Sequence, residues 1–229
     1  MPVLTPKVLC HLAQIAFKES YYQLSRGDRQ QFNKQFLNDI CASAASVEIY
    51  QVYPARAGVD LLVWSSQPME NPQDSAMFFE RFARATLPYR SLLQPVDVLW
   101  GFTKPSQYTK SRSTQEIDPL DPARKRYFVA YPFVKTVEWY LLSQEARQGI
   151  MNGHIKVGKQ FPQITQLLLY SFGLQDQEFI VAYETDDLSE FSDLVYTLRN
   201  TEARRYTLRD TPLITAVYHP AAETLALWE

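Results

Sequence analysis

Apolar residues in the first half of the chain fall alternately into runs typical of strands and into the three- and four-residue spacing typical of helices. The pattern predicts, in chain order, a strand over residues 8–17, a helix over 28–46, strands over 47–52 and 59–64 around a turn, a helix over 72–93 and a strand over 96–102. In the first helix Phe32, Phe36 and Ile40 share one face. This βαββαβ order is the ferredoxin-like arrangement.

The same order of elements returns in the second half of the chain. A stretch rich in Ser, Thr, Asp, Pro and Lys over residues 103–125 has little periodicity and indicates a connecting loop. After it the pattern predicts a strand over 126–133, a helix over 143–160, strands over 164–172 and 178–184, a helix over 187–201 and a strand over 212–217. Asp187 is expected to cap the last helix.

Two ferredoxin-like units of this kind each carry helices on one face of a sheet, so the other face of each sheet must be buried. We therefore expect an α+β protein in which the two sheets pack face to face and form a dimeric α+β barrel. The expected organisation is an N-terminal unit over residues 1–103, a connecting loop over 104–125 and a C-terminal unit over 126–229.

Charge and composition narrow the function classes. The net charge is −2 with both signs spread along the chain, which disfavours nucleic acid as a partner. The first residues show no export signal and no segment approaches the roughly 20 apolar residues that a bilayer span needs, so a cytoplasmic protein without a membrane span is expected. Cys10 and Cys41 fit neither a disulfide framework nor a zinc-ligand spacing.

His154 is the main candidate for chemistry. It recurs with Ile150, Met151 and Val157 at helical spacing, which predicts that it faces the interior. A histidine among apolar residues is often a hydrogen-bonded core residue, and that alternative stays open. No His, Cys or carboxylate stands three or four residues after it, which disfavours zinc, whereas haem iron needs only one axial imidazole from the protein.

Several spaced motifs accompany His154 in the second half. They are Arg126-Tyr127-Phe128-Val129-Ala130-Tyr131-Pro132-Phe133-Val134-Lys135, Glu138-Trp139-Tyr140, Met151-Asn152-Gly153-His154, Gly173-Leu174-Gln175-Asp176 and Thr201-Glu202-Ala203-Arg204-Arg205-Tyr206. With them the chain resembles the chlorite dismutase and coproheme decarboxylase superfamily, and the coproheme decarboxylase type most of all. The resemblance is close from about Arg126 to Val217, and in the first half it rests on length and pattern.

The resemblance implies that His154 is the proximal ligand of the iron in haem b or coproheme III. It also implies that Glu202 holds the other ring nitrogen, which would orient the imidazole and make it a stronger electron donor. A solvated acid beside Arg204 and Arg205 is the alternative for Glu202. On the other side of the porphyrin, members that split chlorite carry an Arg seven residues before the Gly of the Gly-Leu-x-Asp turn.

Counting back seven residues from Gly173 gives Gln166, not Arg. A neutral amide offers hydrogen bonds but no positive charge for an anionic oxidant, which disfavours chlorite dismutation. A distal Gln instead resembles the coproheme decarboxylases. A polar residue on the outer face of a strand is the alternative for Gln166.

Tyr131 and Lys135 match a Tyr-Pro-x-x-Lys motif of that family. There the tyrosine is oxidised to a radical that takes hydrogen from a propionate, and the lysine assists proton transfer. The alternative for Tyr131 is a structural strand tyrosine. The resemblance implies a peroxide-dependent enzyme that converts coproheme III to haem b, with porphyrin and hydrogen peroxide as its partners. It also implies a homo-oligomer, a pentamer in similar proteins.

Four propionates need several cations and hydroxyl groups around the ring. The expected cofactor-binding residues are Tyr108 and Arg112 in the connecting loop, and further candidates are Lys110, Arg199, Arg204, Arg205 and Arg209. A superfamily member that only carries haem or another tetrapyrrole, without catalysis, is the alternative function.

Overall fold

The chain is described by a computed structural model that covers residues 7–109 and 113–229. Its strands are β1 (Lys7–Phe17), β2 (Ser46–Gln51), β3 (Leu61–Met69), β4 (Leu93–Thr103), β5 (Tyr127–Lys135), β6 (Thr165–Tyr170), β7 (Phe179–Thr185), β8 (Thr207–Arg209) and β9 (Ile214–Tyr218). Its α-helices are α1 (Glu19–Tyr22), α2 (Arg26–Cys41), α3 (Asp74–Thr86), α4 (Val137–Leu141), α5 (Gln144–Gly158), α6 (Leu188–Arg199) and α7 (Ala221–Ala226). Two short 3-10 helices, η1 (Leu87–Tyr89) and η2 (Glu202–Tyr206), complete the regular structure of these residues.

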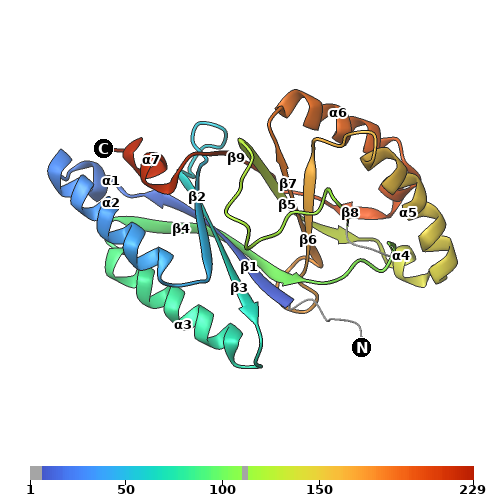
Figure 1. Cartoon of the computed structure of the whole chain (residues 1–229), viewed down its shortest axis with the longest axis horizontal. Helices are drawn as coiled ribbons and strands as arrows, with labels where there is room; N and C mark the ends of the chain where they lie inside the picture. Colours follow the sequence, from blue (N-terminus) through green and yellow to red (C-terminus); the bar gives the residue numbers. More distant parts are fainter. Residues whose placement is uncertain (1–6, 110–112) are drawn as a thin grey trace.

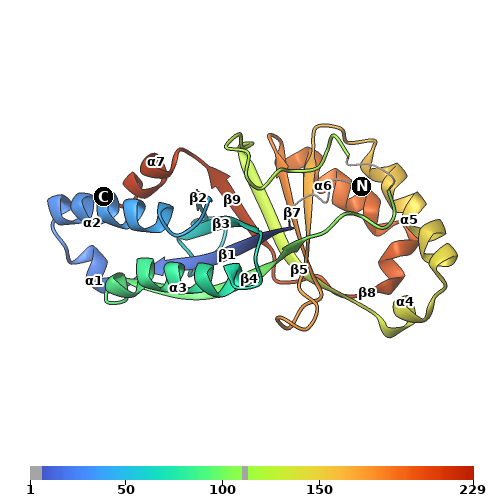
Figure 2. The same cartoon turned by 60° about the horizontal axis from the view of Figure 1, so that its bottom comes forward.

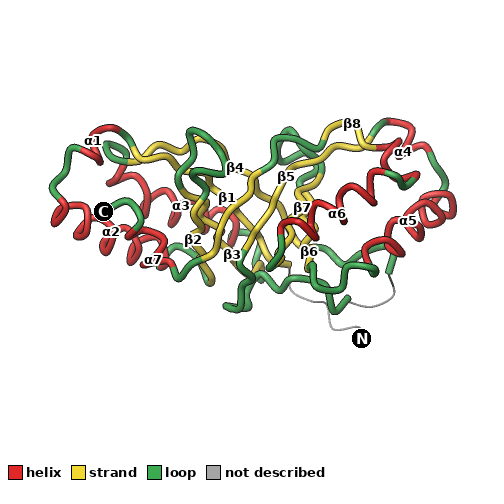
Figure 3. Tube along the Cα trace, turned by 90° about the horizontal axis from the view of Figure 1, so that it is seen from above, coloured by secondary structure: helices red, strands yellow, loops and turns green. Residues whose placement is uncertain are grey.

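The strands of both halves join into one antiparallel sheet that closes on itself. Its order is β7-β6-β4-β1-β3-β2-β9-β5-β8, and β7 also pairs with β5. The halves meet where β2 pairs with β9 and where β4 pairs with β6. Helices lie at the two opposite ends of the molecule with the strands between them (Figure 1 and Figure 3). The α+β barrel expected from the repeated βαββαβ order is confirmed.

Alternation along the strands separates three apolar clusters. In β1 the side chains of Cys10 and Leu12 join a cluster inside the barrel, whereas those of Ile15 and Phe17 pack under the helices of the first half. A third cluster lies between the sheet of the second half and its helices, and includes Val181 and Phe191. Figure 2 shows α2 and α3 flanking the strands of the first half, and α5 and α6 flanking those of the second.

Two helices end earlier than the apolar spacing predicts. The helix expected over 28–46 begins at Arg26, because Ser25 caps it by accepting from the Asp28 N–H at 3.2 Å, and it ends at Cys41. The helix expected over 72–93 ends at Thr86 and continues as η1, since Pro88 disfavours a continued α-helix in the residue before it. Asp187 caps α6 as predicted.

The short elements α1, α4, β8 and α7 and the two 3-10 helices were not foreseen, and α7 connects the chain's end to its beginning. After β9 the chain crosses back, so that α7 packs against α2 and Leu225 joins the apolar cluster of the first half. The Asn33 side chain donates to the Leu225 carbonyl at 3.1 Å. No helix within the described residues is long and apolar enough to cross a membrane.

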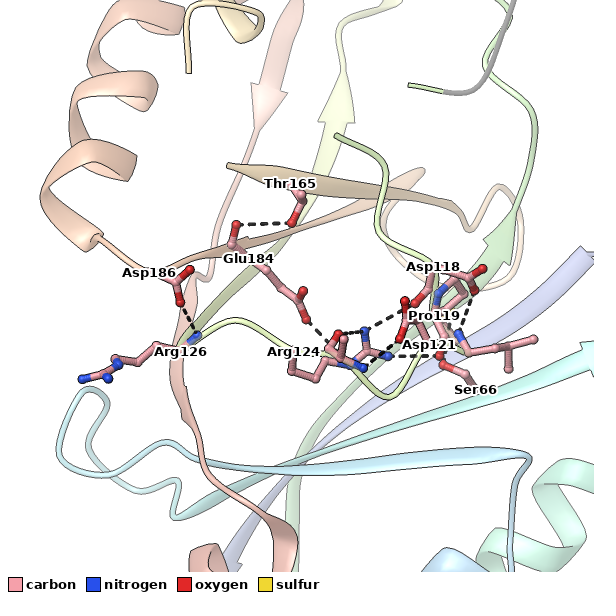
Figure 4. A network of polar contacts seen from close by, with 12 residues as sticks. Ser66, Asp118, Pro119, Asp121, Arg124, Arg126, Thr165, Glu184 and Asp186 are labelled. Atoms are coloured by element: carbon pink, nitrogen blue, oxygen red, sulfur yellow. Dashed lines mark hydrogen bonds and ion pairs between the residues drawn. The ribbon is translucent and has the colours of Figure 1, made fainter. Parts of the chain in front are cut away.

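The connecting loop is fastened to the barrel by Arg124 (Figure 4). Its side chain is 1% exposed, and its guanidinium lies 4.5 Å from the centre of the Trp64 ring. The guanidinium donates to the carbonyls of Pro119 and Ala123 at 3.3 and 3.1 Å, and its Nε lies 3.7 Å from a carboxylate oxygen of Glu184 in β7. One buried cation thus joins the loop to strands of both halves.

Candidate functional site

Three predicted residues lie on the side of the sheet that faces α5 and α6. Tyr131 in β5 pairs with Val181 in β7, and Gln166 in β6 pairs with Tyr183 in β7. Tyr131 packs with Val181 and Tyr183 in the cluster beneath these helices. Leu167 and its neighbour Leu169 point into the barrel, so Gln166 shares the opposite face with Leu168. Lys135, at the end of β5, lies with its Nζ 5.7 Å from the Phe133 ring centre.

The helix that carries His154 packs differently from the expectation. None of the 15 residues of α5, all of which the structure describes, is fully buried, and His154 is half-buried. The main contacts of α5 are with α6 and η2. Val157 near its end and Phe161 just after it join the apolar cluster on the sheet. The face of α5 that was expected to point into the interior is therefore only partly covered. Within the described residues, the buried Nδ1 of His154 has no hydrogen-bond partner.

His154 is neutral at physiological pH. Burial lowers its pKa to about 4, and the nearby positive charge of Lys135 acts in the same direction. A neutral imidazole keeps a lone pair on one ring nitrogen, which is the form that binds metal ions. The side chain is therefore in the state that an axial iron ligand requires.

Lys135 lies in an unusual environment for a lysine. Its Nζ is 4.7 Å from the ring centre of the buried Trp139. Burial lowers its pKa to about 8, Glu178 opposes this change, and the positive charge of Arg204 adds to it. An amine with such a pKa carries a proton at neutral pH and can exchange it readily.

Tyr131 is stacked on Tyr183, with ring centres 6.2 Å apart and ring planes inclined by 29°. Burial raises the pKa of Tyr131, whereas a hydrogen bond with Tyr183 and the charges of Arg199 and Arg204 act in the opposite direction. The phenol is therefore neutral at pH 7, with two guanidinium groups close enough to affect it.

Those arginines belong to a hollow at the surface. Asp210 accepts from Arg199 at 2.5 Å and from Arg204 at 2.6 Å. The hollow, of about 550 Å³, is lined by Arg199, Asn200, Thr201, Glu202, Arg204 and Arg205. Its three guanidinium groups outnumber the carboxylates of Glu202 and Asp210 beside it, so the region favours an anionic group.

Glu202 does not hold the His154 ring in this structure. It is exposed at the start of η2 and lines the hollow, and the His154 Nδ1 makes no hydrogen bond to any described residue. The expected pairing of the two side chains is not formed here, because η2 directs this residue toward solvent. The role of Glu202 stays a prediction.

The connecting loop brings Tyr108 to the helices of the second half. Gln148 of α5 donates to the Tyr108 carbonyl at 3.2 Å, and the rings of Tyr108 and Trp139 lie edge to face with their centres 6.4 Å apart. The Trp139 ring therefore lies close to both Tyr108 and Lys135. The other predicted loop residues, Lys110 and Arg112, lie outside the described residues.

Gln166 is exposed and is held through its backbone. Its N–H donates to the Gln115 carbonyl at 2.7 Å, and its carbonyl accepts from the Ile117 N–H at 3.0 Å. The connecting loop thus runs beside β6. Gln166 lies on the outer face of the barrel, as the structural alternative supposed, but that face is the one that Tyr131 shares. Its catalytic role stays a prediction.

Comparison with known proteins decides the family. The sequence profile of the family described as chlorite dismutase matches residues 26–219. The chain belongs to the chlorite dismutase family. A coproheme decarboxylase of Mycolicibacterium smegmatis is 30% identical to it over 167 residues, which cover 73% of this chain and 70% of that protein. A coproheme decarboxylase of Staphylococcus saprophyticus is 29% identical over 155 residues, or 62% and 61% of the two chains.

Solved structures of the chlorite dismutase family share the fold. A crystal structure of a mutant chlorite dismutase from Candidatus Nitrospira defluvii is 23% identical, with a TM-score of 0.81 over 99% of this chain and 98% of that one. A structure of the same enzyme in complex with imidazole is 21% identical, with a TM-score of 0.81 over 96% and 94% of the two chains. The family and the fold predicted from the sequence motifs are both confirmed.

Within this chlorite dismutase family member, some residues around the predicted site were not singled out from the sequence. Tyr183 stacks on Tyr131, and the charge of Glu178 raises the pKa of Lys135. Asp210 forms ion pairs with Arg199 and Arg204. Tyr183 could have been found, because it alternates with Val181 along one strand face. The sequence around Glu178 and Asp210 gives no such signal, because their contacts with Lys135 and the arginines form only in the folded chain.

Proposed function

We propose that this protein binds an iron porphyrin beside α5 and decarboxylates coproheme III to haem b with hydrogen peroxide as the oxidant. The observation that carries the proposal is the grouping of a neutral His154, a stacked Tyr131 and a half-buried Lys135 on facing elements. The similarity to two proteins named coproheme decarboxylase supports the choice of substrate.

The residues present fit such a group. His154 is neutral and its buried Nδ1 has no partner among the described residues, so one ring nitrogen is available to iron and the other to an acceptor. Phe133 and Phe179 stack at 4.7 Å on the sheet face opposite, and Val157 and Phe161 join the same apolar cluster. Apolar side chains with a few convergent polar groups are typical of cofactor sites.

The bound iron porphyrin would supply the oxidising equivalents of peroxide to the protein. For each propionate the balance is one carboxylate, one hydrogen peroxide and one proton converted to one vinyl group, one carbon dioxide and two waters. Tyr131 would give up the hydrogen of its hydroxyl and then take one from the propionate chain. Lys135, with a pKa of about 8, would exchange the proton that this step requires.

The arginines of the surface hollow would hold propionate carboxylates. Arg199 and Arg204 lie close enough to Tyr131 for their charges to affect its pKa, so a carboxylate held there would lie near the phenol. Tyr108 would add a hydroxyl from the loop beside α5, and we propose the same role for Arg112. Gln166 would offer a neutral amide on the sheet face, without the positive charge that favours an anionic oxidant.

The test is a single-turnover reaction with mass detection. The protein is loaded with iron coproporphyrin III, hydrogen peroxide is added, and the porphyrin mass should fall stepwise by two carboxyl groups with their hydrogens. Tyr131→Phe should stop the reaction without stopping binding, and His154→Ala should weaken binding itself. Tyr196→Phe, at a 73% exposed position on α6, is the matched control and should react like the wild type. An unchanged porphyrin mass in the wild type would contradict the proposal.

Two other outcomes would assign different functions. A Soret band without any peroxide-dependent change of mass would make the protein a haem or tetrapyrrole carrier. Oxygen release from chlorite would show that a neutral Gln166 suffices for that reaction. We further propose a homo-oligomer, with a pentamer expected, which light scattering coupled to size-exclusion chromatography would measure.

A further inference from the structure

Gln115 of the connecting loop lies between the helix that carries His154 and the strand that carries Gln166. Its side-chain Nε2 donates to the Phe161 carbonyl at 2.9 Å and to the Ile164 carbonyl at 3.0 Å, and a third carbonyl, of Gly158, lies at 3.4 Å. These carbonyls belong to the end of α5 and to the turn that leads into β6. One amide group therefore fills the centre of the turn.

An amide suits this position because of the number of hydrogen bonds that its N–H groups can donate. A primary amide has two N–H groups, which match the two shorter bonds. The last carbonyls of a helix have no partner within the helix, and the turn carbonyls beside them are partly withdrawn from water. A side chain without a donor at this position would leave them without the two bonds.

The backbone of the same residue holds Gln166. The Gln115 carbonyl accepts from the Gln166 N–H at 2.7 Å, and the Ile117 N–H donates to the Gln166 carbonyl at 3.0 Å. The side chain of Gln115 thus fixes the end of α5, while its backbone fixes the start of β6. One residue therefore holds both elements in place, the helix that carries His154 and the strand that carries Gln166.

The loop that presents Gln115 is itself anchored on both sides. Before it, Gln148 of α5 binds the Tyr108 carbonyl, and after it Arg124 is buried against Trp64 and Glu184. Gln115 consequently acts from a fixed position, so its bonds can hold the turn in place.

We propose that Gln115 is a positioning residue that sets the separation between α5 and β6, and with it the space that an iron porphyrin occupies between His154 and Gln166. The inference rests on the proposed function for the nature of the ligand. Gln115 does not touch the porphyrin in this role and acts through the two elements that it joins.

The first test needs no ligand. Hydrogen–deuterium exchange of the apoprotein is compared for the wild type, Gln115→Leu and Gln115→Glu. Both variants keep a side chain of similar size, but neither a leucine nor a carboxylate donates to the turn carbonyls. Exchange of the Phe161, Ile164 and Gln166 amides should become about tenfold faster in both, as expected for the loss of roughly 1.4 kcal/mol of local stability.

Gln163→Leu is the matched control, because Gln163 is exposed in the same turn. It should exchange like the wild type. Exchange in α2, far from the turn in the first half, should be unchanged in every variant. If Gln115→Glu behaved like the wild type, the side chain would act by size alone and the proposal would be overturned.

The second test measures the site. Iron coproporphyrin III is titrated into each protein and followed by its Soret band, and the Gln115 variants should bind about tenfold more weakly, with a shifted band, while Gln163→Leu binds normally. Wild-type binding in both variants would overturn the positioning role. The two proposals fail separately: absence of porphyrin binding or decarboxylation in the wild type contradicts the proposed function, whereas a normal wild type with unaffected variants contradicts only the role of Gln115.

Discussion

The pairing of Arg124 with Glu184 should depend strongly on pH. Burial raises the pKa of Glu184 to about 7 from its ordinary value of 4.5, and the charge of Arg124 only partly offsets this change. Between these two values the folded protein holds a proton that the unfolded chain has lost. Stability from this group is therefore present at low pH and falls as pH rises toward 7, by about 3 kcal/mol in all.

The strength of the pair follows from its geometry. Two unit charges 3.7 Å apart interact by roughly 4–5 kcal/mol at an effective dielectric constant of about 20, and breaking a buried pair typically costs about 3–5 kcal/mol. At pH 8 the Glu184 carboxylate is ionised, and a coupling of about 3–4 kcal/mol is expected. At pH 5 the carboxyl group is protonated, and a coupling of less than about 1 kcal/mol should remain, because the two atoms 3.7 Å apart do not form a hydrogen bond.

A double-mutant cycle measures this coupling. The free energy of unfolding in urea is determined at pH 8 and pH 5 for the wild type, Arg124→Met, Glu184→Gln and the double variant. The cycle cancels the loss of the Trp64 stacking, which both Arg124 variants share. A coupling that is equal at the two pH values, or that is below 1 kcal/mol at pH 8, would refute the assignment of a raised pKa to a paired carboxylate.

Three further outcomes are expected. In Gly101→Ala the added Cβ would lie 2.6 Å from the Ser171 Oγ, so the variant should lose about 1–3 kcal/mol of stability in urea denaturation. Burial lowers the pKa of His11 to about 4, so the wild type should lose about 2 kcal/mol from this group between pH 7 and pH 5, and His11→Phe should not. Lys135→Met should raise the pKa of His154 in the apoprotein, measured by NMR titration of the imidazole, because the lysine charge lowers it.

The fold could be predicted from the sequence where elements are long and periodic. Strand β1 and helix α6 follow directly from apolar spacing and from the Asp187 cap. The way in which the barrel closes could not be predicted from apolar spacing, because each junction between the halves is short. Strand β2 pairs with β9 only through Tyr50 with Tyr218 and Gln51 with Val217. Contacts between residues so far apart in the chain depend on edges left unpaired by the rest of the sheet.

The candidate site also has features that the sequence predicts and features that it does not. The register of β5 and β6 on β7 places Tyr131 and Gln166 on one face of the sheet, which the sequence did not predict because Leu167, Leu168 and Leu169 blur the alternation around Gln166. The lowered pKa of His154 could not be predicted, since it depends on burial in the folded chain and on Lys135 from another element. Gln115 has no signal at all, because a glutamine in a polar loop is ordinary until the loop is seen beside α5.

The two anchors of the connecting loop should act as one system. Arg124 holds residues 118–123 against the barrel, and nearby Gln115 holds the turn between α5 and β6. If the loop acts as a rigid connection, Arg124→Met should also speed amide exchange at Ile164 and Gln166 in the apoprotein at pH 8. The same variant should show a smaller increase at pH 5, because protonated Glu184 is then less costly without its partner. Exchange confined to residues around Arg124 would show that the barrel and the candidate site are energetically separate.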